Sequence, residues 1–159
     1  MYVLTAGQND LGMKFLIVLL IAGISGSFTN WQTDFETAKK LAREENRIIL
    51  LNFSGSDWCG PCIKLRKEVF GSDAFQQLAD SSLVLINADF PRGKNNQLSK
   101  DLQNQNETLA ERYNPLGKFP FSVLLNADGS VIRSWEGYPQ NNSQLFISQI
   151  KSVCNGHHQ

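Results

Sequence analysis

Two cysteines separated by two residues are the group in this sequence whose types and spacing most directly support chemistry. They lie in the run Trp58-Cys59-Gly60-Pro61-Cys62. On the first turn of a helix, residues three apart lie on the same side, so the two sulfur atoms come within bonding distance. Cys59 would then occupy the helix N-terminus, where unpaired N–H groups and the helix dipole lower a thiol pKa from about 8.5 toward neutrality. The spacing therefore predicts a redox-active dithiol, in which Cys59 attacks a disulfide and Cys62 resolves the mixed disulfide.

The residues beside the two cysteines bear on how the sulfur atoms would be held. Pro61 restricts the first helical turn and lacks an N–H group where none would be bonded. Trp58 is large enough to shield one flank of the sulfur. Asp57 would act in the opposite sense, because a nearby carboxylate disfavours a thiolate. We therefore expect Trp58, Gly60 and Pro61 to support the site.

Two other interpretations of the cysteine pair stay open. One is a structural disulfide, although so small a ring inside a helical turn constrains little of the unfolded chain. The other is a zinc site, because Cys154 and His157 have the same three-residue offset and would complete a set of three thiolates and one imidazole. A tryptophan before the first cysteine is not typical of zinc ligands, and we expect no metal. As an odd cysteine, Cys154 could also pair between molecules, but its place on an apolar helix face favours a buried, inert thiol.

Length and composition limit the classes of protein to consider. The 159 residues favour one domain, and 42% hydrophobic with 19% charged residues is an ordinary globular balance. Such a chain buries enough surface to fold without disulfides. The 15 basic and 15 acidic residues cancel. We therefore expect no nucleic-acid partner, because there is no basic excess to displace counterions from a phosphate backbone.

The N-terminal residues have the pattern of a secretory signal peptide. Met13-Lys14 precedes an uncharged apolar run at 15–24, and the small residues Ser25-Gly26-Ser27 follow it. The run is shorter than the roughly 20 residues that cross a bilayer, although a core helix or an uncleaved anchor is the alternative. We predict a signal peptide at 1–27, with a start of translation at Met13, and a mature domain at 28–159. This predicts a periplasmic or secreted protein, where disulfides persist.

The pattern of apolar residues along the rest of the chain predicts alternating helices and strands. The predicted helices are 34–45, 59–70, 74–79, one that carries Leu109, Ala110 and Tyr113, and 143–153. The predicted strands are 47–53, 83–88, 121–126 and 131–136, with a hairpin turn at Asp128-Gly129. Residues 91–105 are polar and are expected to form a loop. This order predicts an α/β fold with a central mixed β-sheet flanked by helices on both faces.

Two segments resemble the thioredoxin superfamily. The run at 53–62 follows a buried strand and ends in the cysteine pair, and Gly117-Lys118-Phe119-Pro120 precedes a strand and a hairpin. The resemblance covers residues 34–153 and is similar to exported bacterial thioredoxin-like proteins. It implies a thioredoxin fold, in which Pro120 follows a cis peptide bond and lies against the dithiol. It also implies that the backbone at Phe119, with Pro120, Gly137 and Tyr138, lines a groove for an extended substrate segment; Trp135 serves either this groove or the core.

Three positions depart from that family's pattern. Asn52 stands near the place of a buried aspartate that accepts the proton of the second cysteine, and one residue further from the motif. An apolar residue near Leu85 replaces a frequent lysine, and Phe121 replaces the threonine that commonly follows the proline. Deprotonation of Cys62 would then depend on water or on Asp57.

The resemblance implies a protein-disulfide oxidoreductase that needs no cofactor beyond the dithiol. We expect a reductant or an isomerase that acts on client proteins with disulfides or thiols, receives electrons from a membrane partner, and is a monomer. The alternative is a thioredoxin-fold binding module that holds a partner protein or a metal ion, such as copper(I), through the same cysteines.

Overall fold

The computed structural model describes residues 31–139 and 142–157. The predicted signal peptide at 1–27 and the start at Met13 lie outside the described residues. Within the described part of the chain, no helix is both long and apolar enough to cross a membrane.

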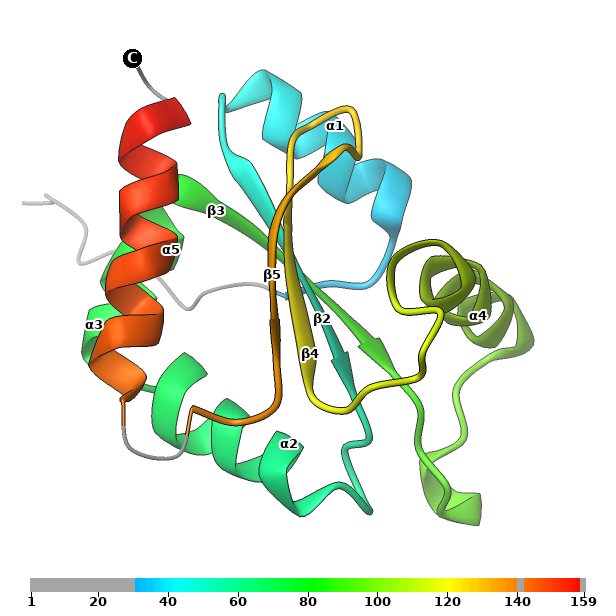
Figure 1. Ribbon diagram of the computed structural model, residues 1–159. Helices are drawn as coiled ribbons and strands as arrows, with labels where there is room; N and C mark the ends of the chain where they lie inside the picture. The colour runs from blue at the N-terminus through cyan, green and yellow to red at the C-terminus, as the bar shows by residue number, and fades with distance from the viewer. Residues whose placement is uncertain (1–30, 140–141, 158–159) are drawn as a thin grey trace, which may run out of the picture.

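A mixed sheet forms the centre of the fold, as predicted, and it has five strands where four were predicted (Figure 1). The strand order is β1-β3-β2-β4-β5. β1, β2 and β3 run parallel, whereas β4 is antiparallel to β2 and β5 is antiparallel to β4. The bounds are Trp31–Gln32 for β1, Ile48–Ser54 for β2, Leu83–Asp89 for β3, Phe121–Leu125 for β4 and Val131–Glu136 for β5.

Helices cover both faces of the sheet, because buried side chains of a strand alternate between its faces. Ile48 and Leu50 of β2 pack with η1, α3 and α5, whereas Ile49, Leu51 and Phe53 pack with α1 and α4. Figure 1 shows α3 and α5 on the left of the sheet and α1 and α4 on the right. The helices are α1 Phe35–Glu44, α2 Gly60–Lys64, the π-helix η1 Leu65–Phe70, α3 Asp73–Ser82, the 3₁₀ turn η2 Lys94–Asn96, α4 Lys100–Tyr113 and α5 Ser143–His157.

The structure corrects the predicted elements at three places. β1 was not predicted, since two residues are too few to show a strand period. Helix α4 begins at Lys100, inside the segment predicted as a loop, after Ser99 caps it by accepting a hydrogen bond from Leu102 N at 3.4 Å. The last helix runs to His157 rather than ending at 153.

Candidate active site

Helix α2 begins at the first cysteine. Cys59 is the N-cap residue, and its Sγ accepts a hydrogen bond from Cys62 N at 3.3 Å. The two cysteines form a disulfide with an S–S distance of 2.05 Å, and only 5% and 4% of their surfaces are exposed. Gly60 and Pro61 between them are exposed. The turn between the two sulfur atoms is therefore open to solvent. The N–H of Cys62 would stabilise a Cys59 thiolate after reduction.

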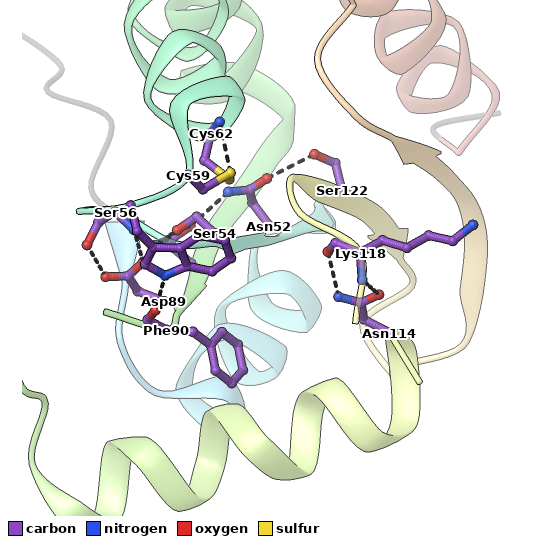
Figure 2. The surroundings of a disulfide bond; sticks show 12 residues. Asn52, Ser54, Ser56, Cys59, Cys62, Asp89, Phe90, Asn114, Lys118 and Ser122 are labelled. Atoms are coloured by element: carbon purple, nitrogen blue, oxygen red, sulfur yellow. Dashed lines mark hydrogen bonds between the residues drawn. A yellow bond between two sulfur atoms is a disulfide. The ribbon is translucent and has the colours of Figure 1, made fainter. Parts of the chain in front are cut away.

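The segment that ends at Pro120 lies beside the tryptophan of the cysteine motif. The Phe119–Pro120 peptide bond is cis. The loop before it is held by Asn114, whose side chain donates to Lys118 O and accepts from Lys118 N, both at 2.9 Å (Figure 2). The Phe119 ring meets the edge of Trp58 at a centroid distance of 5.4 Å. This aromatic contact brings the cis-proline loop and the cysteine motif together.

Trp58 is fixed by the chain that follows β3. Its Nε1 donates to Phe90 O at 2.7 Å, and the Arg92 guanidinium lies 3.8 Å from a ring centroid. Gly55 passes so close that a Cβ there would lie 2.3 Å from the Trp58 ring, which only glycine permits. The Trp58 side chain is thus held in place on the side of Phe90 and Arg92.

Asp57 holds the polar segment that was predicted to be an exposed loop. Its carboxylate accepts hydrogen bonds from Arg92 N at 2.9 Å, Gly93 N at 2.7 Å and Asn96 Nδ2 at 3.0 Å. The bonds from Arg92, Asn96 and Gly93 lower the pKa of the Asp57 carboxyl. The segment after β3 is therefore tied to the residue that precedes Trp58, and it belongs to the wall of the site.

A row of neutral polar side chains crosses three strands beneath the disulfide. Asn52 is buried in β2, opposite Asn87 of β3 and Ser122 of β4. Asn52 Nδ2 donates to Asn87 Oδ1 at 2.8 Å, and Ser122 Oγ donates to Asn52 Oδ1 at 3.0 Å. In Figure 2, Asn52 lies below the disulfide and its amide oxygen points toward Ser122. The Asn52 side chain is thus satisfied on both sides and supplies no titratable group.

At the end of this row lies a carboxylate that was not predicted as a site residue. Asp89, the last residue of β3, accepts from Ser54 Oγ at 2.8 Å, from Ser56 N at 2.9 Å and from Ser56 Oγ. Ser54 also exchanges hydrogen bonds with Asn87. A signal was present in the sequence, because the carboxyl ends of neighbouring parallel strands meet at one edge of a sheet. Ser54 and Asp89 occupy those ends.

The loop after β5 lies next to the cis-proline. Gly137 has a positive φ of 77° and its N–H donates to Pro120 O at 2.9 Å. Tyr138 donates its hydroxyl to the Glu68 carboxylate on η1, and this bond raises the pKa of Tyr138. Trp135 packs in the core instead, against the Phe146 ring at 5.2 Å, and its Nε1 donates to Gln149. Of these three sequence-predicted residues, Gly137 directly borders Pro120.

Cys154 is a free, buried thiol in the core cluster with Phe146 and Ile150. Burial raises its pKa to about 11. Among residues 31–139 and 142–157, no three His, Cys, Asp or Glu side chains gather as a metal site would require.

The amino-acid sequence is similar to a known protein family and to two named relatives. A family described as "Thioredoxin-like" matches residues 30–127. "Disulfide bond reductase DsbH" of Chlamydia pneumoniae is 30% identical over 130 residues, covering 82% of this chain and 75% of that protein. "Thioredoxin-related protein DsbJ" of the same organism is 30% identical over 96 residues, which are 60% of this chain but 27% of that longer protein.

Solved structures show the same fold. A DsbH oxidoreductase superposes with a TM-score of 0.73 at 24% identity, covering 94% of this chain and 95% of that one. A thioredoxin from Thermus thermophilus has a TM-score of 0.59 at 16% identity, covering 80% of this chain and 88% of that one. The predicted thioredoxin fold is confirmed.

The Asp57 carboxyl should titrate below its ordinary value of 3.8 in the folded protein. Because the folded pKa is lowered, its hydrogen bonds stabilise the 92–96 loop fully above pH 3.8, and this contribution is lost as pH falls through the lower folded value. NMR titration of Asp57, with amide exchange of Arg92 and Gly93, measures this. Asp57→Asn should remove the pH dependence of exchange. An Asp57 pKa at or above 3.8 would contradict the assignment.

Cys154 should resist modification in the folded protein. With a pKa of about 11, roughly one thiol in a thousand is ionised near pH 8, and the group is buried. A thiol-disulfide dye added to the reduced, folded protein should therefore react fast with Cys59 and Cys62 only. In denaturant Cys154 should react as well. Fast reaction of Cys154 without unfolding is the result that would refute its burial.

Proposed function

This chain belongs to the thioredoxin-like family, and we propose that it reduces disulfide bonds of client proteins outside the cytoplasm. It is a thiol–disulfide oxidoreductase. The observation that carries the proposal is the Cys59–Cys62 disulfide at the start of α2, with the exposed Gly60 and Pro61 between its halves. The direction agrees with the name of the relative called a disulfide bond reductase.

The reduced protein begins the reaction as a thiolate at Cys59. This thiolate attacks one sulfur of the client disulfide, and the other client sulfur leaves as a thiolate. The resulting mixed disulfide joins Cys59 to the client. The Cys62 thiolate then attacks Cys59 Sγ, and the second client sulfur leaves. Two electrons have passed to the client, and the protein carries the Cys59–Cys62 disulfide that the structure holds.

We further infer where the client segment lies during this exchange. The cis peptide bond follows Phe119, whose ring contacts Trp58 beside the cysteine pair, and Gly137 N donates a hydrogen bond to Pro120 O. An extended segment of the client would pair with Phe119 and pass between Pro120 and the loop of Gly137 and Tyr138. Pro61 and Trp58 would border the other side. This assigns client binding to Phe119, Pro120, Gly137 and Tyr138.

We also propose where this protein acts and which kind of partner reduces its dithiol. The signal-like residues 13–27 support export, with a mature domain from residue 28. In an oxidising compartment the cysteines return to the reduced state only if a partner supplies electrons, and a membrane protein could carry these from the cytoplasm. We propose that the chain acts as a monomer, with the dithiol as its redox group.

Insulin reduction tests the activity. The wild-type protein should accelerate reduction in the presence of a dithiol, because Cys59 attacks and Cys62 releases the product. Cys59→Ser should abolish the acceleration, and Cys62→Ser should accumulate a mixed disulfide on Cys59. Cys154→Ser, which removes the buried thiol, serves as the matched control and should match wild type. An inactive wild type, or an active Cys59→Ser protein, would instead favour the binding-module interpretation.

The reduction potential of the Cys59–Cys62 couple tests the direction. A reductase must hold its electrons less tightly than its clients, so the potential should lie nearer to the value of about −270 mV found for thioredoxin than to about −120 mV found for strong oxidants. Equilibration with a glutathione or dithiothreitol buffer measures it. A potential at the oxidising end of this range would assign disulfide formation instead.

A further inference from the structure

We propose that Asp89 accepts the proton of the Cys62 thiol, through water in a cavity behind the dithiol, when the mixed disulfide is resolved. This rests on the function proposed above. It assigns a role to a residue at the end of β3 that lies outside the cysteine motif and the cis-proline loop.

The second step of the exchange needs a proton acceptor near Cys62. Only the thiolate attacks a disulfide, and burial disfavours the charged form of a thiol. Cys62 is 4% exposed. Asn52 beneath the disulfide is an amide, and its oxygen already accepts from Ser122. An amide cannot take up the proton, so the acceptor must lie elsewhere.

A cavity of about 360 Å³ connects Cys62 with one candidate. Its walls come from the ends of β2 and β3, from α2 and η1, from α4 and from residues 31–33. The charged or titratable side chains that line it are Cys62, Arg66 and Asp89. Asp89 therefore supplies the carboxylate among the side chains that line the same cavity as Cys62, and Arg66 adds a positive charge to that lining. Asp57 does not line this cavity.

The polar lining of the cavity suits water that bridges Asp89 and Cys62. Asp89 accepts three hydrogen bonds from Ser54 and Ser56, and a carboxylate has about four acceptor positions. Asn106 Nδ2 donates to Asp89 O at 2.9 Å, which places this side chain beside Asp89. Asn106 is 1% exposed, and its Oδ1 has no hydrogen-bond partner. A buried acceptor without a protein partner is a position that a bound water molecule would satisfy.

The proton of Cys62 passes through water to an oxygen of Asp89, which becomes a neutral carboxylic acid. The Cys62 thiolate forms a bond with Cys59 Sγ, the bond from Cys59 Sγ to the client sulfur breaks, and the client leaves as a thiolate. Asp89 then returns the proton to water or to the departing thiolate. No further oxidant or reductant is needed.

Rapid quenching tests the proposal on the full chain. Reduced protein that carries Cys154→Ser is mixed with a peptide that contains one disulfide, quenched with acid, and analysed by mass spectrometry for the mixed disulfide. Asp89→Asn keeps an acceptor oxygen for Ser54 and Ser56 but removes the base. Formation of the mixed disulfide should keep its wild-type rate. Its resolution should slow by about tenfold or more near pH 6, as expected when a general base is lost.

The pH dependence distinguishes a lost base from a disturbed structure. In Asp89→Asn the resolving rate should rise in proportion to hydroxide concentration, so that the deficit shrinks as pH rises. Asp101→Asn, an exposed carboxylate in the first turn of α4, is the matched control and should behave as wild type. Ser56→Ala removes an anchor of Asp89 but keeps the carboxylate, and it should slow resolution far less.

Three results would overturn the proposal. They are an unchanged resolving rate in Asp89→Asn, an equal deficit in Ser56→Ala, and slowing by Asp57→Asn in place of Asp89→Asn. If Asp89→Asn does not fold, the wild-type solvent isotope effect and the Ser56→Ala rate decide between a proton transfer and an anchor. If the wild-type protein forms no mixed disulfide at all, the proposed function has failed rather than this inference.

Discussion

The side chain of Cys59 caps the N-terminus of helix α2, and the other parts of the site depend on this position of Cys59. Cys59 caps the helix and accepts a hydrogen bond from Cys62 N at 3.3 Å, so the donor that would stabilise a thiolate comes from the partner cysteine itself. The position of Cys59 follows from the buried strand β2 and from the short loop after it. Gly55 permits that loop to pass against Trp58 at a distance that a side chain would not allow.

The polar side chains around the disulfide form two sets, a neutral set beneath it and a carboxylate at the end of β3. Asn52 beneath the disulfide bridges Asn87 and Ser122, so amides and a hydroxyl join the three central strands at this place. Leaving one of these buried groups without a partner would cost about 1–3 kcal/mol, which explains why the row is complete. The carboxylate lies at the end of β3 instead, as Asp89. The site therefore keeps negative charge away from the disulfide while a carboxylate still faces the cavity behind it.

The polar segment after β3 illustrates what local patterns could not show. Its composition correctly indicated exposure, because Arg92, Gly93 and Asn96 are exposed. Its position depends on Asp57, whose carboxylate accepts hydrogen bonds from groups 35 to 39 residues away in the sequence. Asp57, the residue that precedes Trp58, therefore anchors this loop. The start of helix α4 was predicted too late for a related reason, because its first turn is polar. Two side-chain amides of this helix also form hydrogen bonds with residues far away in the sequence. Gln105 bonds Phe35 N and Thr33 O, and Asn106 bonds Asp89 O.

The sequence by itself predicted the cysteine chemistry and the α/β order of elements. Each depends on residues that are close in the chain: a three-residue offset of cysteines and apolar periodicity within one element. The cis bond at Phe119-Pro120 was implied by the resemblance to the thioredoxin superfamily. Only the tertiary structure decided which polar groups serve the dithiol. Strands β2, β3 and β4 place Asn52 between Asn87 and Ser122, and bring Asp89 to the cavity of Cys62. Hydrogen bonds across a sheet join residues far apart in the chain, so no local spacing could have identified them.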